Sequence, residues 1–91
     1  MKDNSYLKWA DIFKTIGHPI RIKIIETLLE NEKCVRNIWK YLDLPQSTVS
    51  QHLSILRSKG IVENEREGSS VKYFVRDRKI EEIFKIIKSN K

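Results

Sequence analysis

Apolar residues recur every three or four positions through the first two thirds of the chain, which is the spacing of amphipathic helices. This pattern predicts four helices, at about residues 6–16, 19–31, 35–42 and 45–59. Ordinary helix signals mark their boundaries: Asn4 or Ser5 can cap the first helix, Pro19 opens the second, and Gly60 follows the fourth. The break at Asp43-Leu44-Pro45 is short, so we expect a tight turn between the third and fourth helices.

After Gly60 the pattern changes to short runs of β-branched and aromatic residues. Residues 61–66 and 71–76 predict two strands, and Glu67-Gly68-Ser69-Ser70 predicts the turn of a β-hairpin between them. Asp77 can cap a last helix, which has a strong apolar stripe. The stripe consists of Ile80, Ile83, Phe84, Ile86 and Ile87. The fold class predicted is mainly α, with four helices, a β-hairpin and a terminal helix.

The predicted fourth helix is polar on its outward side. Its apolar residues Val49, Leu53 and Leu56 follow the spacing i, i+4, i+7, and we assign them to the core. Its other positions carry short hydrogen-bonding side chains that suit DNA contacts: Gln46, Ser47, Thr48, Ser50 and Gln51. A helix that enters a major groove about 12 Å wide and reaches base edges needs such side chains. Its only charged residues, Arg57 and Lys59, are basic.

Two helices joined by a tight turn and followed by a hairpin are the order of a winged helix-turn-helix. The hairpin, or wing, brings Arg66 and Lys72 near its tip, where basic side chains can enter a minor groove or hold phosphates. Glu63, Glu65 and Glu67 lie in the same hairpin, so we do not expect a uniformly basic wing. These charges can equally be solvated residues that protect a strand edge.

Length and charge narrow the function. A chain of 91 residues has room for one domain, which we expect to span residues 1–91, and its core is thin enough that a second subunit would add burial. The net charge of +6 favours a polyanionic partner such as double-stranded DNA. The N-terminus is too polar and acidic for a signal peptide, and no apolar run approaches the roughly 20 residues of a membrane span. We therefore expect a cytoplasmic protein with no membrane partner.

The chain resembles the ArsR family of winged-helix repressors over nearly its whole length. Three segments carry the resemblance: GHPIRI at 17–22, PQSTVSQHLSILR at 45–57 and GIV from Gly60. The resemblance implies a homodimer built on the first and last helices, a palindromic operator, and release of DNA when a ligand or metal binds. It also implies contacts to bases and phosphates from Gln46, Ser47, Ser50 and Gln51, with His52 following them in the motif.

The sequence departs from metal-sensing members of that family. Where many of them have Cys-x-Cys, this chain has Cys34-Val35-Arg36, and a guanidinium repels a metal ion. No histidine follows His52, so a zinc site on the last helix cannot be assembled. We predict no metal and no cofactor. Cys34 is either a reactive thiol favoured by Lys33 and Arg36 or a small buried apolar residue. The inducer is unknown: the protein has none, or a hydrophobic pocket at the dimer interface binds one.

Two other classes of function are open to a chain of this kind. An enzyme is not expected, because His18 and His52 lie in different helical contexts without a paired nucleophile, and no Gly-rich phosphate loop occurs. A winged helix can also serve as a protein-protein interaction or oligomerisation module without DNA binding. The polar surface at 46–51 argues against that alternative, because a protein-binding helix would more often present aromatic or aliphatic anchors.

Overall fold

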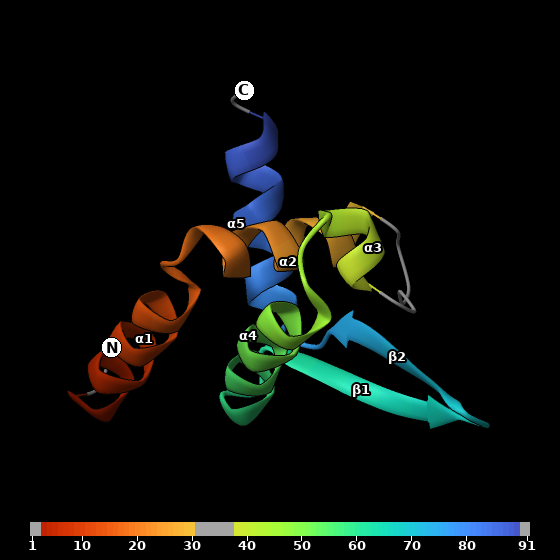
Figure 1. Cartoon of the computed structure of the whole chain (residues 1–91). Coiled ribbons are helices and arrows are strands. Elements are labelled where there is room, and N and C mark those ends of the chain that lie inside the picture. Colours follow the sequence, from red (N-terminus) through yellow and green to blue (C-terminus); the bar gives the residue numbers. More distant parts are fainter. Residues whose placement is uncertain (1–2, 31–37, 90–91) are drawn as a thin grey trace.

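The computed structural model of the protein describes residues 3–30 and 38–89. Four helices are followed by a two-stranded antiparallel sheet and a last helix (Figure 1). The elements are α1 (Asp3–Ile16), α2 (Pro19–Glu30), α3 (Ile38–Leu42), α4 (Gln46–Ser58), β1 (Val62–Glu67), β2 (Ser70–Val75) and α5 (Arg78–Ser89). This order confirms the prediction of a mainly helical winged helix-turn-helix.

The start of α1 differs from the prediction. The helix begins at Asp3, so Asn4 and Ser5 lie inside it and do not cap it. An acidic residue in the first turn interacts favourably with the positive end of the helix dipole, and this allows the helix to begin earlier. The predicted end of the second helix, at Asn31, and the predicted start of the third, at Val35, lie outside the described residues.

Backbone conformation ends α3 and α4 where the sequence predicted. Asp43 follows α3 with φ of 54°, a left-handed conformation that a short polar side chain tolerates. Gly60 follows α4 with φ of 73°. Its N–H donates to the Arg57 carbonyl at 3.0 Å, and the Ile61 N–H donates to the Leu56 carbonyl at 3.1 Å. These two bonds form a Schellman motif, which closes the last turn of α4 and directs the chain into β1.

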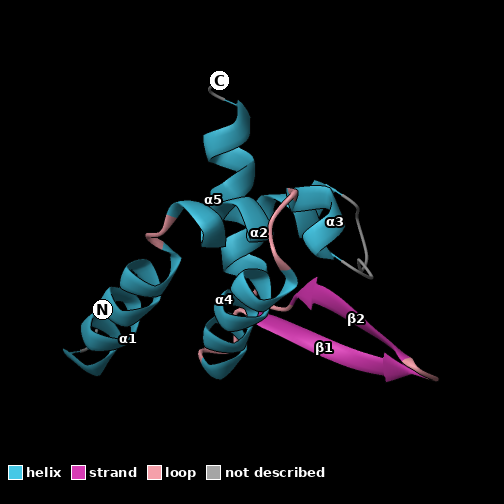
Figure 2. Ribbon diagram, viewed as in Figure 1, coloured by secondary structure: helices cyan, strands magenta, loops and turns pink. Residues whose placement is uncertain are grey.

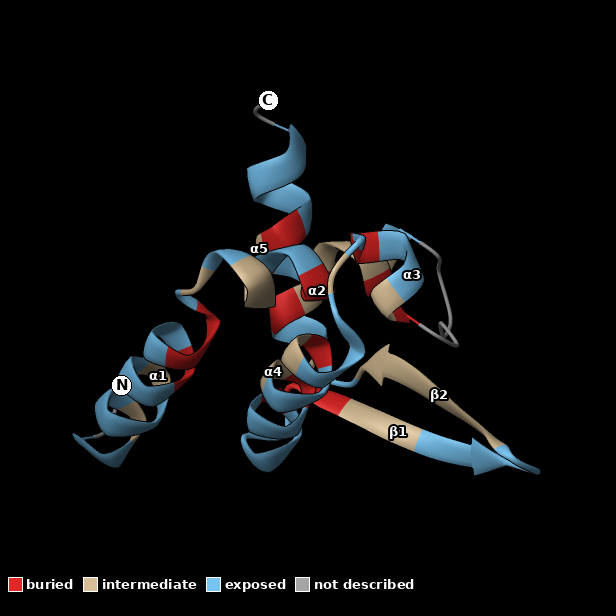
Figure 3. Cartoon of the chain, in the orientation of Figure 1, coloured by how far each residue is buried: buried red, intermediate tan, exposed pale blue. Residues whose placement is uncertain are grey.

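All seven elements surround or adjoin one apolar core. Figure 3 shows the buried residues on the inward sides of the helices and at the start of β1. The buried stripe of α4 is Val49, Leu53 and Leu56, as predicted, and α4 packs against α2 and β1. The whole set of buried apolar residues is Ile12, Ile16, Ile24, Ile25, Leu28, Ile38, Leu42, Val49, Leu53, Leu56, Ile61, Val62, Ile80 and Phe84.

The terminal helices bury only part of their apolar stripes. Ile12 and Ile16 of α1, and Ile80 and Phe84 of α5, reach the core. Leu7 on α1 is 76% exposed, and Ile86, which belongs to the predicted stripe of the last helix, is 63% exposed. Both helices project from the body of the molecule (Figure 1). The two helices meet at a cation–π contact, in which the Lys79 ammonium of α5 lies 5.3 Å from the ring centre of Trp9 on α1.

The hairpin extends away from the helices (Figure 2). Its strands pair in a register that runs from Val62 opposite Val75 to Glu67 opposite Ser70, so the turn consists of Gly68 and Ser69. Each strand is displaced by one residue from the prediction. Gly68 has φ of 63°, a conformation that hairpin turns require and that glycine adopts without strain. None of the described helices is long and apolar enough to cross a bilayer.

Replacement of Leu53 by alanine tests the core. Because Leu53 is only 3% exposed, Leu53→Ala is expected to lower the free energy of unfolding by about 2 to 5 kcal/mol. The measurement is urea denaturation followed by circular dichroism. Ser54→Ala, at the next and exposed position, is the matched control and is expected to change stability by less than about 0.5 kcal/mol. Similar stabilities of the two variants would contradict the assignment of Leu53 to the core.

Candidate nucleic-acid interface

The polar face of α4 is exposed. Gln46, Ser47, Ser50 and Gln51 are all exposed, and we call these four residues the reading face. Thr48 is half-buried beside the fully buried Val49, and Arg57 is exposed in the last turn. Because an α-helix has 3.6 residues per turn, residues spaced three or four positions apart lie on the same side. The buried apolar stripe and the exposed polar residues therefore occupy different sides of α4. The structure thus places the predicted polar residues of α4, Thr48 apart, on accessible surface.

The first turn of α4 suits an anion. It contains no acidic residue, and no described residue supplies a side-chain cap at Pro45. The first backbone N–H groups of any helix lack acceptors within the helix, and the dipole makes that end positive. A DNA phosphate near Gln46 or Ser47 would therefore meet favourable electrostatics.

The wing adjoins the reading face. A hollow of about 260 Å³ lies between α4 and the hairpin. Gln46 and Ser50 line it from α4, and Ser69 and Ser70 line it from the tip of the hairpin. Its other lining residues are Trp39, Leu53, Val71 and Tyr73. The hairpin and α4 thus form one continuous surface, with hydroxyl groups on both sides and the Gln46 amide on the α4 side.

The charges of the wing are mixed, as the sequence indicated. Lys72 forms an ion pair with Glu67 within the hairpin, and Glu65 is its cross-strand neighbour. Arg66 is exposed on β1. Since Lys72 is compensated by a carboxylate, Arg66 is the more available of the two predicted basic contacts.

His52 is turned toward α2, unlike the reading face. Its Nδ1 accepts a hydrogen bond from Arg21 Nε at 3.1 Å, and its ring centre lies 4.5 Å from that of His18. Burial lowers the pKa of His52 below its usual value of 6.5, and electrostatic interactions with His18 and Arg21 lower it further. Sequence reasoning treated the two histidines as unrelated and missed Arg21. The available signal was that all three lie in the segments GHPIRI and SQHL, the most distinctive parts of the chain.

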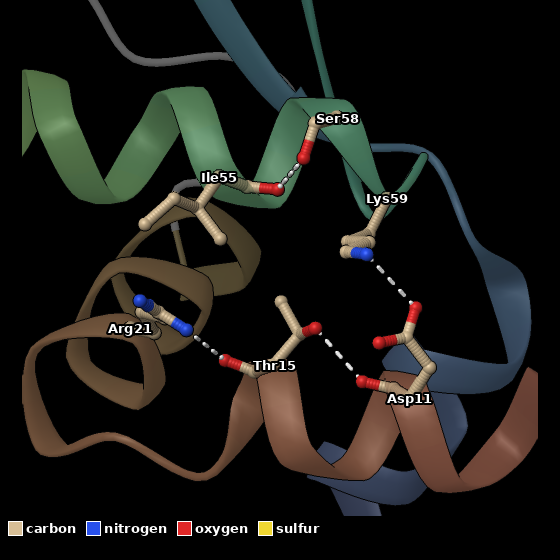
Figure 4. Close-up of polar contacts among 6 residues, drawn as sticks. All are labelled: Asp11, Thr15, Arg21, Ile55, Ser58 and Lys59. Carbon is tan, nitrogen blue, oxygen red and sulfur yellow. Dashed lines mark hydrogen bonds and ion pairs between the residues drawn. The ribbon is translucent and has the colours of Figure 1, made fainter.

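A second polar contact ties the other end of α4 to α1. Figure 4 shows Lys59 facing Asp11, and their Nζ and Oδ2 atoms are 3.1 Å apart. The backbone carbonyl of Asp11 also accepts a hydrogen bond from the Thr15 hydroxyl at 2.8 Å. Both charged side chains are about half exposed, so the pair contributes little to stability. It still limits where the end of α4 can lie relative to α1.

The predictions on metal and thiol chemistry concern residues outside this surface. No three His, Cys, Asp or Glu side chains of residues 3–30 and 38–89 lie together in a way that could hold a metal ion. Cys34 lies outside the described residues.

Known proteins share this arrangement of helices and wing. Residues 18–64 match the family described as bacterial regulatory proteins, arsR family. The chain belongs to the arsR family. A regulator of the helix-turn-helix type from Methanocaldococcus jannaschii is 42% identical over 90% of this chain and 93% of its own length. The crystal structure of the transcriptional repressor PagR of Bacillus anthracis has a TM-score of 0.85 at 35% identity, covering 94% of this chain and 99% of PagR.

A further solved structure agrees. HlyU from Vibrio cholerae has a TM-score of 0.84 at 27% identity, covering 96% of this chain and 94% of HlyU. Membership of the arsR family confirms the resemblance found in the sequence and makes the chain a DNA-binding transcriptional regulator. The relative from Methanocaldococcus jannaschii is described as a transcriptional regulator, and PagR is described as a transcriptional repressor. The matched segment contains His18, Arg21, the reading face and His52.

The environment of His52 predicts a pH-dependent stability. Because its pKa is lowered in the folded protein, the unfolded chain takes up a proton first as the pH falls through 6.5, and folding loses stability until the folded ring also titrates. His52→Asn keeps an acceptor oxygen near the place of Nδ1 and cannot titrate. Wild type is therefore expected to lose more stability than His52→Asn between about pH 7.5 and about pH 5. Urea denaturation across that range measures it, and equal losses would contradict the prediction.

Proposed function

We propose that this arsR-family chain is a homodimeric repressor that binds a palindromic operator in double-stranded DNA. The observation that carries the proposal is the two-faced α4, in which a buried stripe supports an exposed reading face. In this proposal α4 lies in the major groove and the wing lies beside it.

The side chains of the reading face suit different parts of DNA. Gln46 and Gln51 can each form two hydrogen bonds with an adenine edge, and Ser47 and Ser50 can bond to bases or phosphates. Arg57 and Arg66 are exposed and can hold phosphates on either side of the groove. Lys72 can add to the wing contact where a phosphate competes with Glu67. Thr48 is half-buried, which suits a phosphate contact from its hydroxyl better than a base contact.

The exposed apolar residues of the terminal helices support a dimer. Leu7 and Phe13 on α1, and Ile86 and Ile87 on α5, are each more than half exposed. Helices with this much exposed apolar surface usually pack against a partner, and a small core gains from that burial. A two-fold dimer would present two copies of α4 to half-sites about 34 Å apart, which explains why a palindromic operator is expected.

Repression is proposed from the relatives. PagR of Bacillus anthracis, to which this chain is similar over most of its length, is described as a transcriptional repressor. A repressor needs only to occupy its operator, and the exposed reading face beside the wing supports that role. A chromosomal target is also consistent with the expected cytoplasmic location.

Substitution of the reading face tests DNA recognition. An operator is first obtained by selecting bound duplexes from a random library. Ser50→Ala and Gln51→Ala are then expected to reduce discrimination for that operator by about 1 to 3 kcal/mol for each lost base contact, with the fold unchanged. Ser58→Ala, on the same helix, is the control, because its hydroxyl donates to the Ile55 carbonyl at 2.7 Å (Figure 4). Fluorescence anisotropy measures the affinities.

Equal affinity of Gln51→Ala, Ser50→Ala and wild type for the operator would contradict the assignment of the reading face. Failure of the wild-type protein to select any duplex would favour the alternative of a protein-protein interaction module.

A charged residue on the last helix tests dimerisation. Ile87 is 55% exposed, and Ile87→Glu would place a carboxylate in the proposed apolar interface, so it is expected to weaken the dimer at least about tenfold. Tyr41→Glu is the control, because Tyr41 is 64% exposed but lies on α3. Light scattering at micromolar concentration measures the mass of each. A monomeric wild-type protein, or equal disruption by both variants, would refute the interface.

A further inference from the structure

One guanidinium joins three helices beside the reading face. Arg21 lies on α2, donates from Nη1 to the Thr15 carbonyl of α1 at 3.0 Å, and donates from Nε to His52 Nδ1 of α4 at 3.1 Å. Figure 4 shows the first of these bonds at the place where α1 ends. Since the guanidinium is a planar fork with fixed donor directions, these two bonds restrain the position of α4 relative to α1 and α2.

This junction depends on the protonation state of His52. An arginine N–H can only donate, so the hydrogen bond requires an unprotonated Nδ1 on His52. The ring of His18 lies against that of His52, and His18 Nδ1 in turn accepts the Ile20 N–H at 3.1 Å. A proton on His52 Nδ1 would oppose the Arg21 N–H and place two like charges in contact.

Few charges at the junction could compensate such a proton. The charged or titratable groups that act on His52 are His18, which precedes α2, and Arg21 on α2. The group that α1 contributes to the junction is the Thr15 carbonyl, which accepts from Arg21. The carboxylate of Asp11, one turn earlier on α1, forms an ion pair with Lys59. Within α4 itself the only charged residue is Arg57. Burial, His18 and Arg21 all lower the pKa of His52, so its environment disfavours the protonated ring.

We propose that Arg21 is a positioning residue, which holds α4 in its DNA-reading orientation through His52, and that protonation of His52 releases α4 and lowers discrimination for the operator. The inference rests on the proposed function, because His52 directly follows Gln51 of the reading face. A bidentate contact to a base edge tolerates little displacement, since hydrogen bonds weaken steeply with distance and angle. Contacts to phosphates that do not depend on sequence tolerate more. Acidification therefore reduces selectivity more than total DNA binding.

The test compares affinity for the selected operator with affinity for a scrambled duplex of the same length and base composition. The ratio is measured for the full chain at constant salt from about pH 8 to about pH 5.5, which spans the ordinary titration of histidine. In wild type the ratio is constant above about pH 6.5 and then falls, at most tenfold per pH unit for each protomer that takes up a proton. Because the scrambled duplex carries the same phosphates, the ratio removes the general attraction of DNA for a protonated histidine.

Variants separate positioning from a purely structural role. The readout for His52→Asn is the slope of the ratio with pH, and this slope is expected to be zero. Arg21→Gln and Arg21→Lys are expected to lower the ratio at about pH 8 at least about fivefold, because neither keeps the forked charged donor. Thermal unfolding checks that each variant is folded. If the Arg21 variants unfold, the slope of His52→Asn still decides the question.

A measurement without DNA tests the junction by itself. NMR titration of the free protein is expected to place the His52 pKa below its ordinary value in wild type and higher in Arg21→Gln, which removes one positive charge. A wild-type ratio that is constant or rises on acidification, an unchanged slope in His52→Asn, or an ordinary pKa for His52 would each overturn the inference and leave the proposed function standing. Failure of wild type to discriminate any duplex at about pH 8 would overturn both.

Discussion

The structure depends on the packing of one face of α4. Val49, Leu53 and Leu56 are buried where α4 meets α2 and β1, and this burial sets the rotation of the helix about its axis. Since 3.6 residues make one turn, that rotation turns the positions between them toward solvent. The reading face is thus a consequence of the core. Ile61 and Val62 are buried in the same core and anchor the start of the hairpin. The wing therefore lies beside α4.

Apolar packing is not directional, and polar contacts supply what it lacks. The Arg21–His52 hydrogen bond and the Lys59–Asp11 ion pair restrain α4 at two separate points along its length. The ion pair is half exposed and contributes little to stability. The hydrogen bond is part-buried, so its loss would leave polar groups poorly solvated. A regulator that must recognise a sequence needs this restraint more than it needs the added stability.

The terminal helices show the limit of a small chain. A chain of 91 residues cannot cover every apolar stripe that its helices carry. The body of the molecule therefore takes Ile12, Ile16, Ile80 and Phe84 and leaves the outer parts of α1 and α5 exposed. In the proposed dimer this uncovered surface holds the subunits together, and the geometry of that contact would set the spacing of the two reading faces.

The sequence by itself determined the order of the elements, the inward stripe and polar face of α4, and the stop at Gly60. Each of these depends on neighbours within about two helical turns, through helical periodicity or a left-handed backbone. The start of α1 was missed by three residues and each strand by one, because several local signals compete there. Only the tertiary structure brought Arg21 to His52 across 31 residues, paired Lys72 with Glu67, and left Leu7 and Ile86 exposed. Periodicity shows which face a residue occupies, but the fold decides what covers that face.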